Sequence, residues 1–117
     1  SYANALVKQG EYQRANELFE CGLEIDDEHI PTLNSYANAL VKQGEYQRAN
    51  ELFECGLEID DEHIPTLNSY ANALVKQGEY QRANELCKSS LNLDYTNNPI
   101  ALHIYKKTLA NQEIYEG

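Results

Sequence analysis

Carboxylate and imidazole groups gather in one short stretch of the sequence, where they could hold a cation. This stretch runs from Glu24 to His29, and its letters return from Glu58 to His63. Calcium-binding loops need Asp or Asn at alternate positions followed by Gly, and the stretch has neither feature. The pattern is more typical of a solvated loop, with weak adventitious cation binding as the alternative. We therefore expect no metal site and no cofactor.

Cysteine and histidine are the other residue types that could carry catalysis. Cys21, Cys55 and Cys87 belong to no Cys-x-x-Cys motif and to no Cys/His spacing that binds metal. No nucleophile motif accompanies the histidines, which are His29, His63 and His103. No glycine-rich phosphate loop occurs either, so we expect a protein that is not an enzyme. Three free thiols suit a reducing compartment, which favours the cytoplasm.

Acidic side chains outnumber basic ones in this chain. The 117 residues include 19 Asp and Glu against 9 Lys and Arg, a net charge of −10. Such a chain repels the phosphates of nucleic acids and the surface of anionic membranes. No apolar run approaches the ~20 residues of a membrane-spanning helix, and no signal-peptide pattern is seen. The composition indicates one soluble globular domain that binds neither nucleic acid nor membranes.

The sequence repeats itself with a period of 34 residues. Residues 1–34 return letter for letter as residues 35–68, and a third copy holds from Ser69 to Leu86. Three prolines keep the period beyond that point: Pro31, Pro65 and Pro99. Identity over 68 residues indicates either a very recent duplication or an engineered array made by copying one repeat, and we favour the engineered array.

Each copy is predicted to form two helices. Apolar residues recur at steps of three and four, as on one face of a helix, and no stretch alternates at every second residue. Proline suits the first turn of a helix and glycine its end, which sets the boundaries. We expect a shortened helix over residues 1–9 and its partner, then helices over residues 31–42, 45–59, 65–76, 79–93 and 99–113.

A two-helix unit of this length cannot bury its apolar face alone, so the copies must stack. The two-helix unit over residues 31–64 reads Leu33-x-x-Tyr36-Ala37-x-x-Leu40, then Ala49-x-x-x-Phe53, then Asp61. This pattern resembles the tetratricopeptide repeat, Trp-x-x-Leu-Gly-x-x-Tyr, then Ala-x-x-x-Phe, then Pro. The resemblance implies an all-α, right-handed superhelix of three helix-turn-helix repeats with a C-terminal capping helix. The expected boundaries are 1–30 for the shortened first repeat, 31–64, 65–98, and 99–117 for the cap.

The resemblance also implies a function. In that family the first helix of each repeat usually lines a concave groove, so we expect a non-catalytic scaffold that binds extended peptide segments of partner proteins. Asparagine can donate to and accept from a peptide backbone, and lysine can hold carboxylates. The expected groove residues are Asn4, Lys8, Asn34, Asn38, Val41, Lys42, Asn68, Asn72, Val75 and Lys76.

Some family members grip the C-terminal carboxylate of a heat-shock chaperone with a clamp of Lys, Asn and Arg side chains. Only Asn38 matches that clamp here. Its other mapped positions fall on Asn34, Ser69 and His103. We therefore expect no tight binding of a chaperone tail.

The alternative interpretation is a designed or duplicated structural repeat protein that has no specific ligand. Its two ends carry apolar residues that could meet in neighbouring molecules: Leu6, Tyr12, Leu102, Ile104, Leu109 and Ile114. Such a head-to-tail contact extends into rows unless the rotation closes a ring. We expect this association to strengthen with salt, because a charge of −10 makes the copies repel one another.

Overall fold

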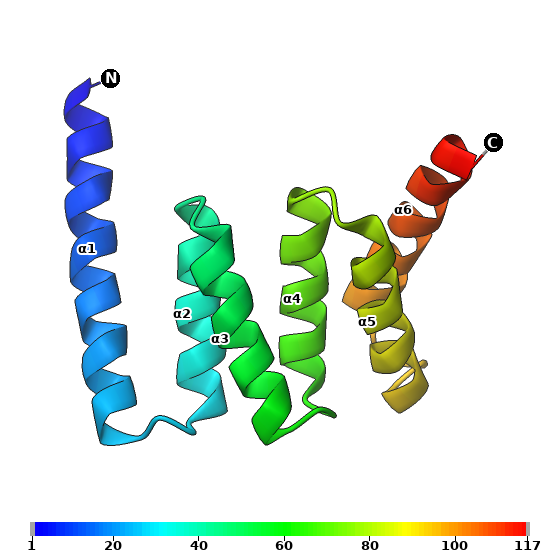
Figure 1. Ribbon diagram of the computed structural model, residues 1–117, viewed down its shortest axis with the longest axis horizontal. Coiled ribbons are helices and arrows are strands. Elements are labelled where there is room, and N and C mark those ends of the chain that lie inside the picture. Colours follow the sequence, from blue (N-terminus) through cyan, green and yellow to red (C-terminus); the bar gives the residue numbers. More distant parts are fainter. Residues whose placement is uncertain (1, 117) are drawn as a thin grey trace. The chain divides into compact units, whose positions relative to one another are not determined.

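The computed structural model describes the backbone of residues 2–116 and the side chains of residues 9–111. Over this range the chain has helices and turns but no strand, as predicted (Figure 1). The helices are α1 (Tyr2–Ile25), α2 (Ile30–Lys42), α3 (Tyr46–Ile59), α4 (Ile64–Lys76), α5 (Tyr80–Leu93) and α6 (Pro99–Glu116). They form two compact units, an N-terminal unit of residues 1–56 and a C-terminal unit of residues 57–117.

The turns after α2 and after α4 are built in the same way. Gly44 takes a φ of 79°, in the left-handed region that glycine enters without strain. The Glu45 N–H then donates to the Leu40 carbonyl at 2.9 Å, which closes the end of α2. Gly78, with a φ of 80°, does the same after α4. Both turns fall where the sequence predicted them.

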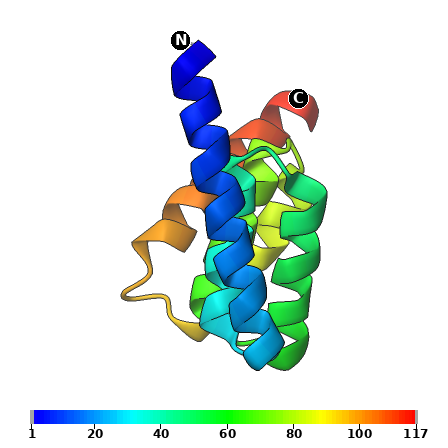
Figure 2. The same ribbon diagram turned by 90° about the vertical axis from the view of Figure 1, so that its left-hand side faces the viewer.

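The first copy folds differently from the two that follow. A helix over residues 1–9 and a turn at Gly10 were expected, but α1 continues through Gly10 without a break, so six helices replace seven over residues 2–116. Figure 2, in which α1 faces the viewer, shows this helix extending beyond α2. An unbroken helix keeps all its backbone hydrogen bonds. A turn is favoured over it only where the two joined helices bury apolar surface together.

Histidine caps begin α2 and α4, although the sequence analysis assigned no role to these residues. His29 Nδ1 accepts the Thr32 N–H at 3.3 Å and lies 2.7 Å from the Thr32 hydroxyl oxygen. His63 and Thr66 repeat both contacts before α4. These bonds satisfy donors that are otherwise free at a helix start. The histidines of the acidic loops are therefore structural, and no metal-holding group of His, Cys, Asp or Glu is found among the described residues.

Most of the buried apolar residues lie on the predicted apolar stripes. Ala37 and Ala49 are both 0% exposed, at the positions where the two helices of a repeat must cross closely. The large core residues of the N-terminal unit are Leu33, Tyr36, Leu40, Leu52 and Phe53. Those of the C-terminal unit are Leu67, Tyr70, Leu74, Leu86 and Ile104. The sequence pattern thus identifies most of these core residues, but not Ile104, which was expected to contact a second molecule.

Candidate functional site

The first helices of the repeats, α2, α4 and α6, differ in charge from α1, α3 and α5. α2, α4 and residues 99–111 of α6 contain no Asp or Glu, although the chain has a net charge of −10. Their lysines are all exposed: Lys42, Lys76, Lys106 and Lys107. The acidic residues within 9–111 lie on α1, α3, α5 and the loops. On a negative protein, the charged side chains of α2, α4 and residues 99–111 of α6 are therefore all positive.

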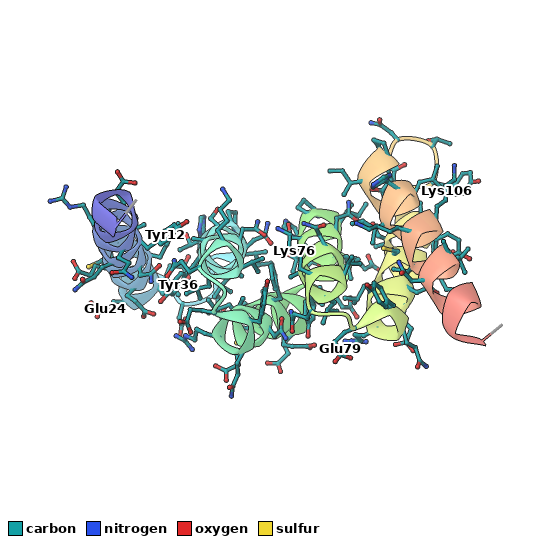
Figure 3. The ribbon with its side chains drawn as sticks, turned by 90° about the horizontal axis from the view of Figure 1, so that it is seen from above. Tyr12, Glu24, Tyr36, Lys76, Glu79 and Lys106 are labelled. Atoms are coloured by element: carbon teal, nitrogen blue, oxygen red, sulfur yellow. The ribbon has the colours of Figure 1, made fainter. Side chains whose placement is uncertain are left out.

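In the C-terminal unit this positive surface draws on α4 and α6, which pack against each other. Asn72 and Lys76 are exposed on α4, and Val75 beside them is half-buried. Lys106, at the repeat position of Asn72, is exposed on α6; Figure 3 labels it together with Lys76. An amide and two ammonium groups offer hydrogen bonds and positive charge on neighbouring helices. This combination suits a carboxylate-bearing, extended ligand.

In the N-terminal unit α2 presents the equivalent residues unevenly. Lys42 is exposed, Asn38 is half-buried, and Val41 is 8% exposed. Asn34 is half-buried, and its Oδ1 atom is buried without a hydrogen-bond partner among the described residues. The side chains of Asn4 and Lys8 lie outside the described residues. The predicted ladder of amides is therefore accessible at only some of its steps.

Asn68 has a structural role that its spacing did not reveal. Ser90 Oγ donates to Asn68 Oδ1 at 2.6 Å, and Asn68 Nδ2 donates to Asn98 Oδ1 at 2.9 Å. The side chain is 8% exposed, so this network leaves little of it for a ligand. Ser90 and Asn98 stand where the third copy departs from the exact repeat, and that departure was the available signal.

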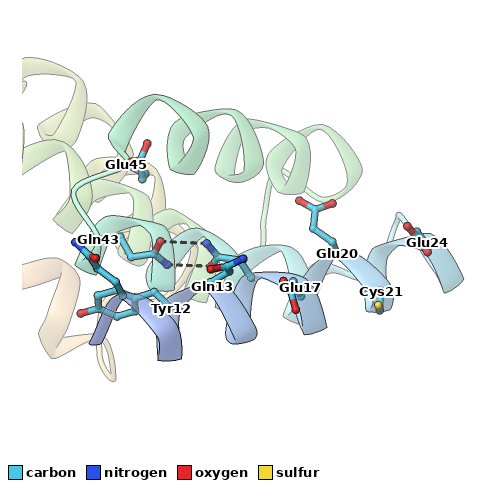
Figure 4. Close-up of a pocket in the computed structure, with 10 residues that line it drawn as sticks. Tyr12, Gln13, Glu17, Glu20, Cys21, Glu24, Gln43 and Glu45 are labelled. Atoms are coloured by element: carbon cyan, nitrogen blue, oxygen red, sulfur yellow. Dashed lines mark hydrogen bonds between the residues drawn. The ribbon is translucent and has the colours of Figure 1, made fainter. Parts of the chain in front are cut away.

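The N-terminal unit contains an open pocket of about 770 Å³ that the sequence analysis did not anticipate (Figure 4). It lies between α1 and the turn from α2 to α3. Asn16 and Gln43 exchange two amide hydrogen bonds there, at 2.9 and 3.1 Å. Four carboxylates contribute to the lining: Glu17, Glu20, Glu24 and Glu45. The amide pair fixes α1 to the end of α2, and the four carboxylates make the lining unfavourable for anionic ligands.

A small cluster next to this pocket completes the attachment of α1. The ring of Phe19 stacks on that of Tyr36, with centroids 5.3 Å apart. Burial, and after it a hydrogen bond with Glu20, raises the pKa of Tyr36 above its ordinary value of 10.0. Glu20 also pairs with Arg48 of α3 at 3.4 Å. Both partners of that ion pair are about half exposed, so it contributes little to stability.

The three thiols have different environments. Cys21 and Cys55 are exposed, whereas Cys87 is 0% exposed. Cys87 stands at the repeat position of Phe53, so it fills part of the core of the C-terminal unit. Burial raises its pKa to about 11. A thiol that stays protonated at neutral pH is a poor nucleophile.

The apolar residues expected to join two molecules are only partly available. Ile104 is 4% exposed because it belongs to the core of the C-terminal unit, so the expectation that it contacts a second molecule is wrong. Leu102 is half-buried, and Leu109 is 37% exposed. Tyr12 is half-buried and lines the pocket of Figure 4. The side chains of Leu6 and Ile114 lie outside the described residues.

Other apolar side chains are more exposed than those predicted. On α1, Leu18 is 68% exposed and Ile25 is 88% exposed. Neither stands out in the sequence, because the same letters are far less exposed at Leu52 and Ile59 of the next copy. None of the helices within residues 2–116 combines the length and the apolarity that crossing a membrane requires.

Comparisons with known proteins bear on the fold. A family model described as PPR repeat matches residues 31–58, and no curated protein matches. The first TPR of Spaghetti (RPAP3), bound to the HSP90 peptide SRMEEVD, aligns with a TM-score of 0.82 and 17% identity, over 94% of this chain and 86% of that one. The Sgt2 TPR domain from Aspergillus fumigatus aligns with a TM-score of 0.83 and 20% identity, over 100% of this chain and 79% of that one. The second TPR domain of human RPAP3, in complex with the HSP70 peptide SGPTIEEVD, aligns with a TM-score of 0.74 and 22% identity, over 90% of this chain and 87% of that one. The chain is therefore a helical repeat protein with the tetratricopeptide-repeat fold.

Proposed function

We propose that this protein is a non-catalytic scaffold that binds extended, acidic peptide segments of partner proteins on the faces of its first helices. The carrying observation is the separation of charge. On a chain of net charge −10, α2, α4 and residues 99–111 of α6 carry lysines and no carboxylate. Attraction of an acidic segment to these helices would be local, since the rest of the surface repels it.

Two further observations support the proposal. Two proteins of the same fold hold the peptides SRMEEVD and SGPTIEEVD, each with a pair of adjacent glutamates. The exposed Asn72 can bond a peptide backbone through its amide while Lys76 and Lys106 pair with carboxylates. A short peptide buries less than a standard interface, so we expect a Kd of roughly 1 μM or weaker.

The expected partner is a protein segment in the cytoplasm rather than a nucleic acid. A nucleic acid carries phosphates along its whole length, so it would extend beyond the lysines onto the acidic surface that repels it. Since only Asn38 corresponds to the chaperone-tail clamp, the binding of a chaperone tail should be weaker than that of another acidic segment.

The test is a fluorescence-anisotropy titration with an acidic heptapeptide and its Glu→Gln counterpart. The variant combines Lys76→Ala with Lys106→Ala, and Lys88→Ala, an exposed lysine of the second helix α5, is the matched control. We expect the acidic peptide to bind at least about tenfold more weakly to the double variant than to the control. Equal affinities of the parent protein, the double variant and the control for the acidic peptide would refute the proposal. So would equal binding of the acidic peptide and its Glu→Gln counterpart.

A second candidate function is structural, a repeat protein without a specific ligand that associates head-to-tail. The exposure of Leu18 and Ile25 favours it, because large apolar side chains on a helix surface are a typical interaction feature. A peptide array separates the candidates. Retention of no extended peptide, together with association of the protein itself, would favour the structural role.

A further inference from the structure

One sequence takes two structures within this molecule. Residues 1–25 and 35–59 are the same letters. The second stretch forms most of α2, a turn at Gly44, and α3, whereas the first forms the unbroken helix α1. The intrinsic preference of these letters is identical in the two places, so the choice between them depends on tertiary contacts and on residues 30–34, with which α2 begins.

The unbroken helix leaves an apolar face uncovered. Leu18 is 68% exposed, whereas its repeat equivalents Leu52 and Leu86 are 4% and 5% exposed. Ile25 is 88% exposed against 42% for Ile59. In the C-terminal unit, where α4 packs along α5, the equivalent face is covered. The face of α1 that carries Leu18 is therefore one that a preceding first helix normally covers.

The segment that could cover this face directly precedes it in the chain. Residues 2–9 carry the letters of residues 36–43, among which Tyr36, Ala37 and Leu40 are buried. Gly10 has nothing within 4 Å of the place where a Cβ would stand, and Gly44 and Gly78, in the same local sequence, take φ values of 79° and 80°. The turn that would bring the segment back is thus formed twice elsewhere in the chain.

We propose that α1 opens and closes at Gly10. In the open form, residues 2–9 continue the helix, and in the closed form they fold back over Leu18 through the turn that Gly44 makes in the next copy. The open form keeps the backbone hydrogen bonds of an unbroken helix, and the closed form buries the apolar face of α1. Each form gains one favourable term and gives up the other, and both forms are populated where their free energies differ little.

Closure would also extend the proposed peptide surface, a consequence that rests on the proposed function. Asn4 and Lys8 have the repeat positions of Asn38 and Lys42. In the closed form they would take the places of these residues on an added first helix. A ligand that contacts this helix would favour the closed form by its difference in affinity for the two forms.

The test changes the chirality of one residue in the chain of residues 1–117. Cys21 allows a synthetic peptide of residues 1–20 to be joined by native ligation to residues 21–117. Gly10→L-Ala favours the helix, and Gly10→D-Ala favours the positive φ of the turn. The readouts are nuclear Overhauser contacts between Leu18 and residues 2–9, and amide exchange at Tyr12 and Gln13. These amides are bonded inside an unbroken helix but are unpaired in the first turn of a new one.

We expect the D-Ala protein to show contacts between Leu18 and residues 2–9 and fast exchange at Tyr12 and Gln13. The L-Ala protein should show neither, with a closed-to-open ratio at least about tenfold lower. Identical contacts and exchange in both proteins would overturn the proposal. So would contacts that appear only between labelled and unlabelled molecules, because these would assign the face to a second copy. Neither readout involves a peptide, so the outcome is independent of the proposed function.

Discussion

Asn34 and Asn68 are the same residue of two identical copies, but only one has its hydrogen bonds satisfied. Asn68 bonds to Ser90 and Asn98, whereas the Oδ1 atom of Asn34 is buried without a partner among the described residues. Gly56 stands at the repeat position of Ser90 and offers no hydroxyl. The repeated letters thus place the same polar residue at both positions, but the group that satisfies it at only one of them.

Gly56→Ser should therefore stabilise the protein by about 1 kcal/mol. The hydroxyl would donate to Asn34 Oδ1, as Ser90 does to Asn68, and serine costs less than glycine inside a helix. Urea unfolding of the variant, of Asn34→Ala and of the double variant measures the coupling between the two residues. A gain of the same size in the Asn34→Ala background would assign the whole effect to helix propensity.

The free energy of unfolding at alkaline pH should depend on Cys87. Its pKa is raised from 9.0 to about 11 because the folded protein buries the thiol, and that of Tyr36 is raised above 10.0. Folding therefore holds these protons more tightly than the unfolded chain does. The stabilisation is complete below about pH 9 and is lost as the pH rises from 9 to 11.

Urea unfolding at pH 8, 9, 10 and 11 should show this loss, and it should be smaller in Cys87→Ala than in the parent. Cys55→Ala, which removes an exposed thiol, is the control. Thiol labelling at pH 8 should modify Cys21 and Cys55 quickly and Cys87 only on unfolding. A flat pH profile in the parent, or rapid labelling of Cys87, would contradict the assigned burial.

At the scale of elements, Gly10 and Gly44 have the same local sequence and opposite requirements. Gly10 lies inside α1, where alanine is preferred, whereas Gly44 has a φ of 79°, where alanine is strained. Gly10→Ala should stabilise the protein by up to about 1 kcal/mol, and Gly44→Ala should destabilise it by about 1–2 kcal/mol. Thermal unfolding followed by circular dichroism measures both. If Gly10→Ala destabilised the protein as Gly44→Ala does, the first copy would contain the same turn as the other copies.

The helices after Ile25 could be predicted from the sequence to within three residues, because apolar spacing, proline and glycine all mark the same boundaries. The continuity of α1 could not, since its letters are those of a helix-turn-helix elsewhere in the chain. The proposed binding surface was only partly predictable for the same reason. Lys76 and Asn72 are exposed as expected, but the burial of Asn68 depends on partners 22 and 30 residues away.

For the whole molecule, charge opposes association while exposed apolar side chains favour it. A net charge of −10 keeps copies apart at low salt, and screening shortens that repulsion to about 8–10 Å at physiological ionic strength. Light scattering should therefore rise with protein concentration, and more steeply with added salt. Leu18→Ser should weaken the effect, since it removes a side chain that is 68% exposed, while Tyr95→Ser, at 72% exposed on a loop, should not. A monomer at millimolar concentration in high salt would exclude this association.

Identical residues in different copies have different surroundings. This difference determines how the sequence would diverge under selection. A substitution accepted in one copy need not be accepted in another, because Phe53 and Cys87 already fill one repeat position with side chains of different size. In a library that varies every position, tolerance should be read copy by copy. We expect Gly56 to be replaced early, because the Oδ1 atom of Asn34, in the same repeat, lacks a hydrogen-bond partner among the described residues. Neutral drift would then turn a uniform array into one whose repeats can no longer be exchanged.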